Sequence, residues 1–326
     1  MEYATIAQNK MNGIAERIDA IMLTGRKKEP QAYKTLAKII QDENDELEAR
    51  VHAVRALCNL DKHEAYPILL KTLENANKDI RLEAIASAYL LNDSRILFPL
   101  VNIYNQLNPN NEEESIERYA IIRALGASED SRATEFLKSL CTSKDTNTAR
   151  LAREALNACR FASEMLYTFN GPESQRNEAT RKNIGRAIWS AQDLKKAISM
   201  IKDEQKNGAY YATYVILPID KDIPFGKGKG CYLVLAPRRS EHVCVAKGQD
   251  VLGAGEIGIN KETLEVDYVD NHSGGYLPGK TSFRWVKNAL DRARINCPLK
   301  EFSANYPPNG YFTDEFLSQQ PLYKKK

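Results

Sequence analysis

The sequence has 326 residues, of which 43% are hydrophobic and 27% are charged, and its 46 basic and 43 acidic side chains leave a formal net charge of +3. This composition is typical of a globular protein long enough to form two domains. The small excess of positive charge does not favour a function based on phosphate contacts, so nucleic acid is a possible partner that the composition does not single out.

The sequence indicates neither a protein stabilised by metal sites or disulfides nor a secreted or membrane-spanning protein. The six cysteines are scattered without any Cys-x-x-Cys pair, so we expect no metal site and no disulfide framework. The first residues lack a signal-peptide pattern, and no apolar run is long enough to cross a membrane. We therefore expect a cytoplasmic protein that binds no membrane, and we identify no cofactor motif.

Similar amphipathic helices recur along the first half of the chain. Helices that start near Arg50, Arg81, Arg118 and Arg150 follow one another at intervals of 31, 37 and 32 residues, and each of the first three is followed by a second apolar helix. Two helices per repeat at this spacing predict an α-solenoid, in which each pair of helices buries its apolar face against the next pair.

The pattern R-x-x-A-x-x-A-L in these helices resembles HEAT repeats, and given the short period it is nearer to the PBS-lyase type, over about residues 30–160. The resemblance implies a surface for a macromolecular partner, which we expect to be a protein. We predict a HEAT-like α-solenoid over residues 1–168, with an N-terminal capping helix within residues 1–24.

The solenoid is expected to be followed by a linker and a second domain. Residues 169–177 lack hydrophobic periodicity and predict a linker. Residues 178–206 keep a helical spacing of apolar positions and predict one long helix that ends at Asn207-Gly208. This helix would begin a second domain over residues 178–326.

After Gly208 the pattern changes to short runs rich in β-branched and aromatic residues. Short connections between the runs predict an α+β domain with a mainly antiparallel sheet of about five strands. The five predicted strands are YYATYVILPI, CYLVLAPRR, HVCVAKG, AGEIGIN and LEVDYVDN. A helix capped by Thr281-Ser282 is expected next, and its apolar side chains should lie on the sheet: Phe283, Trp285, Val286 and Leu290.

Part of this domain resembles a domain found in uncharacterised bacterial proteins, with the pattern EHV…AGE…NxSxxYxP. The family has no established activity to transfer, and its cysteine-rich tail is missing here because no paired cysteines follow Phe312. The matching residues are Glu241, His242, Gly248, Val251, Leu252, Ala254, Gly255, Glu256, Asn271, Ser273, Gly275, Tyr276 and Pro278.

The turn from Asn271 to Pro278 is the best candidate for a site. Its two glycines allow the backbone to approach a ligand closely, and a helix begins just after it, which is typical of an anion-binding turn. Acid–base chemistry would need histidine and carboxylate side chains, and we select His272, Glu256 and His242 as candidate catalytic residues. Candidate ligand-binding residues are Asn271, Ser273, Gly274, Gly275, Tyr276, Lys280, Arg238 and Arg239.

Two functions follow from these features. The first is a scaffold whose solenoid binds a protein partner and whose second domain binds a small or phosphate-bearing ligand at the turn. The alternative is a bacterial effector or toxin-like enzyme that uses histidine and glutamate in ribonuclease-like chemistry or nucleotide-group transfer. The first function is favoured if Glu256 is paired with an arginine and Tyr276 or Trp285 fills the turn. The second function is favoured if the histidines and Glu256 converge on an open pocket.

Overall fold

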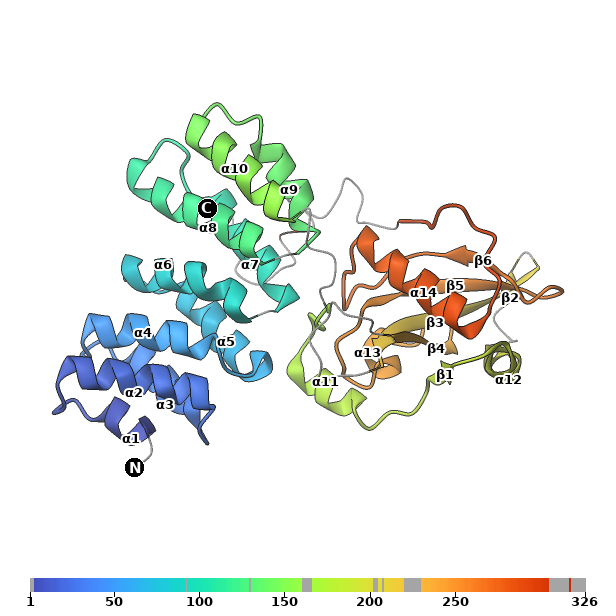
Figure 1. Ribbon diagram of the computed structural model, residues 1–326, viewed down its shortest axis with the longest axis horizontal. Coiled ribbons are helices and arrows are strands. Elements are labelled where there is room, and N and C mark those ends of the chain that lie inside the picture. Colours follow the sequence, from blue (N-terminus) through green and yellow to red (C-terminus); the bar gives the residue numbers. More distant parts are fainter. Residues whose placement is uncertain are drawn as a thin grey trace. The chain divides into compact units, whose positions relative to one another are not determined.

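The computed structural model describes residues 3–91, 93–128, 130–159, 166–201, 205–206, 208–219, 230–304 and 317. The chain forms two compact units, one of residues 1–162 with 312–326 and one of residues 163–311 (Figure 1). Helical repeats come first and a mainly antiparallel sheet follows, as the sequence predicts. Among the described residues, no helix combines the length and apolar character needed to cross a membrane.

The first unit is built of paired helices. Helices α2, α4, α6, α8 and α10 each pack against the next in this series, so they form one layer of the solenoid (Figure 1). Two helices, α1 and α2, occupy the place of the single capping helix expected within residues 1–24, because the chain turns between them. The helices are α1 (Tyr3–Gln8), α2 (Ile14–Lys27), α3 (Ala32–Gln41), α4 (Leu47–Leu57), α5 (Lys62–Leu73), α6 (Lys78–Ser87), α7 (Leu97–Gln106), α8 (Glu112–Ala127), α9 (Ala133–Leu140) and α10 (Thr146–Cys159).

Consecutive repeats carry buried ion pairs at equivalent positions. Arg95 pairs with Asp93 at 2.6 Å, and Arg132 pairs with Asp130 at 2.7 Å, with all four side chains at most 6% exposed. Arg132 also donates a hydrogen bond of 2.6 Å to the backbone carbonyl of Ser94 in the preceding repeat. Each buried charge is therefore paired, as burial requires, and the arginine links its own repeat to the one before it.

The second unit is built around one antiparallel sheet. Its strand order is β1-β4-β3-β5-β6, and the short β2 pairs with β3. The elements are α11 (Glu173–Ala179), β1 (Arg186–Ile188), α12 (Ala191–Ile201), β2 (Gln205–Lys206), β3 (Ala209–Pro218), β4 (Cys231–Pro237), α13 (His242–Val245), β5 (Gly253–Asn260), β6 (Val266–Val269) and α14 (Phe283–Ala293).

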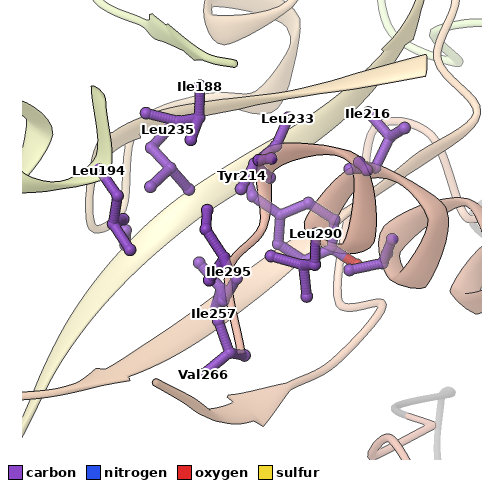
Figure 2. Close-up of a cluster of buried hydrophobic side chains, with 14 of the residues drawn as sticks. Ile188, Leu194, Tyr214, Ile216, Leu233, Leu235, Ile257, Val266, Leu290 and Ile295 are labelled. Atoms are coloured by element: carbon purple, nitrogen blue, oxygen red, sulfur yellow. The ribbon is translucent and has the colours of Figure 1, made fainter. Parts of the chain in front are cut away.

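Both faces of this sheet are covered, which explains why its central strands are apolar almost throughout. On β3, Tyr214 and Ile216 point to the face covered by α12 and α14, while Val215 and Leu217 point to the opposite face, which is covered by α11, α13 and the segment around Phe169. Figure 2 shows side chains of the first cluster drawn from the strands and from both helices. As predicted, α14 lies on the sheet, with its apolar side chains in the first cluster: Phe283, Trp285, Val286 and Leu290.

The prediction of one long helix over residues 178–206 is wrong. The end of α11, then β1, α12 and β2, occupy this stretch. The break lies at Gly185, where a Cβ atom would come within 2.6 Å of Val234 on β4, so the backbone here lies against the sheet. A new helix then starts where Ser190 and Asp193 cap each other, with Ser190 Oγ accepting from the Asp193 amide at 3.2 Å.

Two further expectations for this unit need correction. The predicted strand HVCVAKG is the short helix α13, and the chain leaves it through Lys247 and Gly248, which both have positive φ. The expected linker at 169–177 is part of the fold, because Phe169 is buried in the second cluster and α11 begins at Glu173. Ser282 is the N-cap of α14, but its side chain makes no capping hydrogen bond.

Candidate functional site

A buried aspartate at the end of β6 organises the strand ends that meet the candidate turn. Asp270 Oδ1 accepts from the backbone amides of Glu256 at 2.7 Å and His272 at 2.9 Å, and Oδ2 accepts from the Tyr268 hydroxyl at 2.8 Å. The Asp270 backbone carbonyl accepts from the Tyr214 hydroxyl at 2.6 Å. Burial and the bond to Asp270 raise the pKa of Tyr268. These bonds satisfy a carboxylate that is 2% exposed, so Asp270 has a structural role here.

The turn from Asn271 to Pro278 is closed mainly by its own groups. Asn271 Nδ2 donates to the Pro278 carbonyl at 2.7 Å, and the Ser273 carbonyl accepts from the Leu277 amide at 2.8 Å. Tyr276 is 1% exposed and fills the turn, and its hydroxyl donates to the Gln249 carbonyl at 2.7 Å. Asn271 and Ser273 are buried as well, so these expected ligand-binding side chains help to build the turn.

His242, the first residue of α13, is held by a neighbouring strand. Its Nε2 lies 3.1 Å from the Gly255 carbonyl, which can only accept, so Nε2 carries the hydrogen. Burial lowers the pKa of His242, although the bond to Gly255 and the charge of Asp270 act in the opposite direction. The neutral ring therefore keeps Nδ1 as an acceptor, and Nδ1 makes no hydrogen bond to the described residues.

A pocket of about 340 Å³ lies beside the turn, within the second unit. It combines the outer side of the turn at Gly274 and Gly275, the start of α13, and the segment that leads into α11. The pocket size is at the lower end of the range of small-molecule sites. The lining residues are Phe169, Asn170, Gly171, Gln175, Glu241, His242, Val243, Gly274 and Gly275.

Phe169 and the turn glycines fit together closely. A Cβ atom at Gly275 would lie 2.7 Å from the Phe169 ring, and one at Gly171 would lie 2.3 Å from it. The Asn170 amide donates to the Gly275 carbonyl at 2.7 Å, which joins this segment to the turn. At Gly274 a Cβ would meet nothing within 4 Å, so this residue faces open space.

The other candidate residues lie outside the pocket lining. Glu256 pairs with Arg238 at 3.2 Å, with both side chains about one quarter exposed, while Arg239, His272 and Lys280 are exposed. Of the three candidate catalytic residues, the lining contains only His242. Glu256 is thus paired with an arginine and Tyr276 fills the turn, which is the arrangement that favours a binding role.

Several pocket residues were missed by the sequence reasoning. The sequence predicts a linker for the segment that contains Phe169, Asn170, Gly171 and Gln175, because a stretch without periodicity gives no sign that it packs on a sheet. Glu241 could have been selected, since it belongs to the EHV pattern that resembles the bacterial domain. In the described ranges, no cluster of three or more histidine, cysteine, aspartate or glutamate side chains has the arrangement of a metal site.

Comparison with solved structures finds several helical repeat proteins. The complex of CpcE and CpcF of phycocyanin lyase from Nostoc sp. PCC7120 is 20% identical, with 56% of this chain and 70% of that chain covered and a TM-score of 0.37. A designed armadillo repeat protein is 19% identical, with 48% of this chain and 80% of that chain covered and a TM-score of 0.32. No curated protein matches the chain.

Comparison with family models gives two matches in the first unit. Residues 8–94 match the model of HEAT repeats, and residues 117–143 match the model of the PBS lyase HEAT-like repeat. These matches confirm the resemblance that the arginine-led helices indicate, and they start before the predicted residue 30. Residues 8–94 of this chain therefore contain HEAT repeats, and residues 117–143 contain a HEAT-like repeat of the PBS-lyase type.

Proposed function

We propose that the protein is a HEAT-repeat scaffold whose solenoid binds a protein partner and whose second unit binds a small ligand in the pocket beside Gly274. The pocket carries the second part of this proposal. It combines an apolar ring, that of Phe169, with an acceptor, Nδ1 of His242, whose tautomer is fixed by the bond from Nε2 to Gly255. A concave site of this kind, with few oriented polar groups, is typical of ligand binding.

The solenoid part of the proposal is supported by the HEAT repeats themselves, because stacked helix pairs present an extended surface to macromolecules. Tyr89 and Leu90, between α6 and α7, are 41% and 38% exposed, and paired apolar side chains on a surface favour protein contact. The double variant Tyr89→Ser/Leu90→Ser should weaken binding to a partner isolated with the wild-type protein while leaving the melting temperature nearly unchanged. Undiminished binding would place the contact elsewhere.

The ligand-binding part can be tested with a variant that fills the pocket. Gly274→Leu places a side chain in the open space beside the pocket without a clash at Cβ. A fragment library screened by ligand-observed NMR on the full-length protein should give compounds that bind the wild type and lose binding to Gly274→Leu. Leucine at exposed Gly13, where a Cβ also meets nothing, is the matched control. Fragments that bind all three proteins alike would contradict the proposal.

Acid–base catalysis by His242 is a second candidate. It is favoured by the neutral imidazole with Nδ1 as its acceptor, which is the form that a general base requires. Glu256 and His272 do not assist this catalysis inside the pocket, since Glu256 pairs with Arg238 and His272 is exposed outside the lining. This candidate predicts a substrate whose turnover is lost in His242→Gln while its binding is retained, and equal turnover in both proteins would eliminate it.

A further inference from the structure

The lining of the pocket carries negative charge and no positive charge. Among the nine lining residues, Glu241 is a carboxylate and none is lysine or arginine. Arg238, one of the expected ligand-binding residues, pairs with Glu256 and lies outside the lining. The lining therefore has one carboxylate and no cation, while Lys182, which pairs with Glu178 at 3.1 Å, interacts electrostatically with Glu241 from outside the lining.

Glu241 is held at the pocket by two side chains. Its Oε2 accepts from Gln175 Nε2 at 3.2 Å and from Cys244 Sγ at 3.4 Å. The second carboxylate oxygen makes no hydrogen bond to the described residues. One oxygen of an oriented carboxylate thus remains to accept a hydrogen bond from a ligand.

His242, which follows Glu241 in the sequence, adds a second acceptor to the pocket. The Gly255 carbonyl fixes the hydrogen on Nε2, so Nδ1 offers a lone pair. Phe169 supplies an apolar wall against which a hydrocarbon or aromatic part of a ligand can pack. Glu241 and His242 therefore offer two acceptors to the pocket beside the apolar ring of Phe169.

We infer that the ligand of this pocket is a small amine, an ammonium group on a compact apolar body, and that it binds between Glu241 and Nδ1 of His242. This inference rests on the proposed ligand-binding function and replaces its phosphate-bearing alternative. An ammonium group donates to both acceptors and neutralises the carboxylate. A phosphate would rely on backbone amides such as those of Gly274 and Gly275, with the Glu241 carboxylate close by and repelling it.

The inference is tested with four probes of similar shape: benzylamine, benzyl alcohol, benzoate and phenyl phosphate. Their affinities for the full-length protein are measured at neutral pH by calorimetry or ligand-observed NMR. Benzylamine should bind about two- to fivefold more tightly than benzyl alcohol, since Glu241 is exposed and solvent screens its ion pair with the ammonium group. Glu241→Gln should remove this preference, and Glu262→Gln, which changes an exposed carboxylate in the β5–β6 connection, should retain it.

The outcomes separate this inference from the proposed function. If benzoate or phenyl phosphate binds as tightly as benzylamine and this binding is lost in Gly274→Leu, the inference of an amine ligand is wrong. The proposed ligand-binding function of the pocket would still hold. A benzylamine preference that persists in Glu241→Gln would also overturn the inference of an amine ligand. If none of the four probes binds at millimolar concentration and the fragment screen finds nothing that Gly274→Leu displaces, the proposed ligand-binding function fails with it.

Discussion

The adjacent glycines of the turn should respond differently to one added methyl group, with a loss of stability at Gly275 and almost no change at Gly274. In Gly275→Ala the new Cβ would lie 2.7 and 2.9 Å from two atoms of the Phe169 ring. The ring is only 6% exposed, and it is confined on another side by Gly171, where a Cβ would be 2.3 Å away. Overpacking of this kind costs about 1–3 kcal/mol. For a unit of this size, a loss of about 2 kcal/mol lowers the melting temperature by roughly 4–8 °C.

Gly274→Ala is the matched control, because its Cβ meets nothing within 4 Å. Its free energy of unfolding should stay within about 0.5 kcal/mol of the wild type. Tryptophan fluorescence is the appropriate assay, since both tryptophans, Trp189 and Trp285, belong to the second unit and report its unfolding separately from that of the repeats. Equal stabilities of the two variants would refute the packing of Phe169 on the turn, as would a Gly275→Ala loss that Phe169→Leu does not reduce.

Three further predictions concern a buried ion pair, a buried hydroxyl and a titrating ring. Arg132→Met leaves Asp130 charged and unpaired in the solenoid and should cost about 3–5 kcal/mol; circular dichroism of thermal unfolding measures this, and an unchanged transition contradicts it. Tyr276→Phe removes the donor to the Gln249 carbonyl and should cost about 1 kcal/mol in fluorescence-monitored urea unfolding, so a gain in stability would contradict it. Because burial lowers the pKa of His242 below 6.5, the unfolded chain binds the proton more readily, and the second unit should lose stability as the pH falls below that value. His242→Gln should lack this part of the loss, and identical pH profiles would refute the assignment.

The helical repeats could be predicted from the sequence because their signal is periodic and local. Arginine-led helices recur at nearly constant spacing, and each helix carries its own apolar stripe. The central strands β3 and β5 were predicted for a similar reason, since ten and eight consecutive residues, respectively, form each strand. These features depend on neighbours in the sequence, so the sequence alone contains them.

The pocket could not be predicted because it depends on contacts between distant segments. Phe169 and Gly275 are far apart in the chain, and nothing in the composition of residues 169–177 signals that they pack on a turn. The alternation in His242–Val245 suggested a strand, yet those residues form one helical turn ended by positive-φ residues. The motif at Glu241–His242 was visible, but its orientation toward a pocket was not.

The most direct test of the account is the state of the His242 ring, because the ligand site depends on it. Long-range proton–nitrogen NMR correlation spectra of the full-length protein, with His242→Gln to assign the signals, report which ring nitrogen carries the hydrogen. At neutral pH we predict a neutral ring with the hydrogen on Nε2, and a change at Nδ1 alone when benzylamine is added. A ring protonated on Nδ1, or one whose Nδ1 signal is unaffected by every probe and by every fragment that binds the protein, would contradict the account.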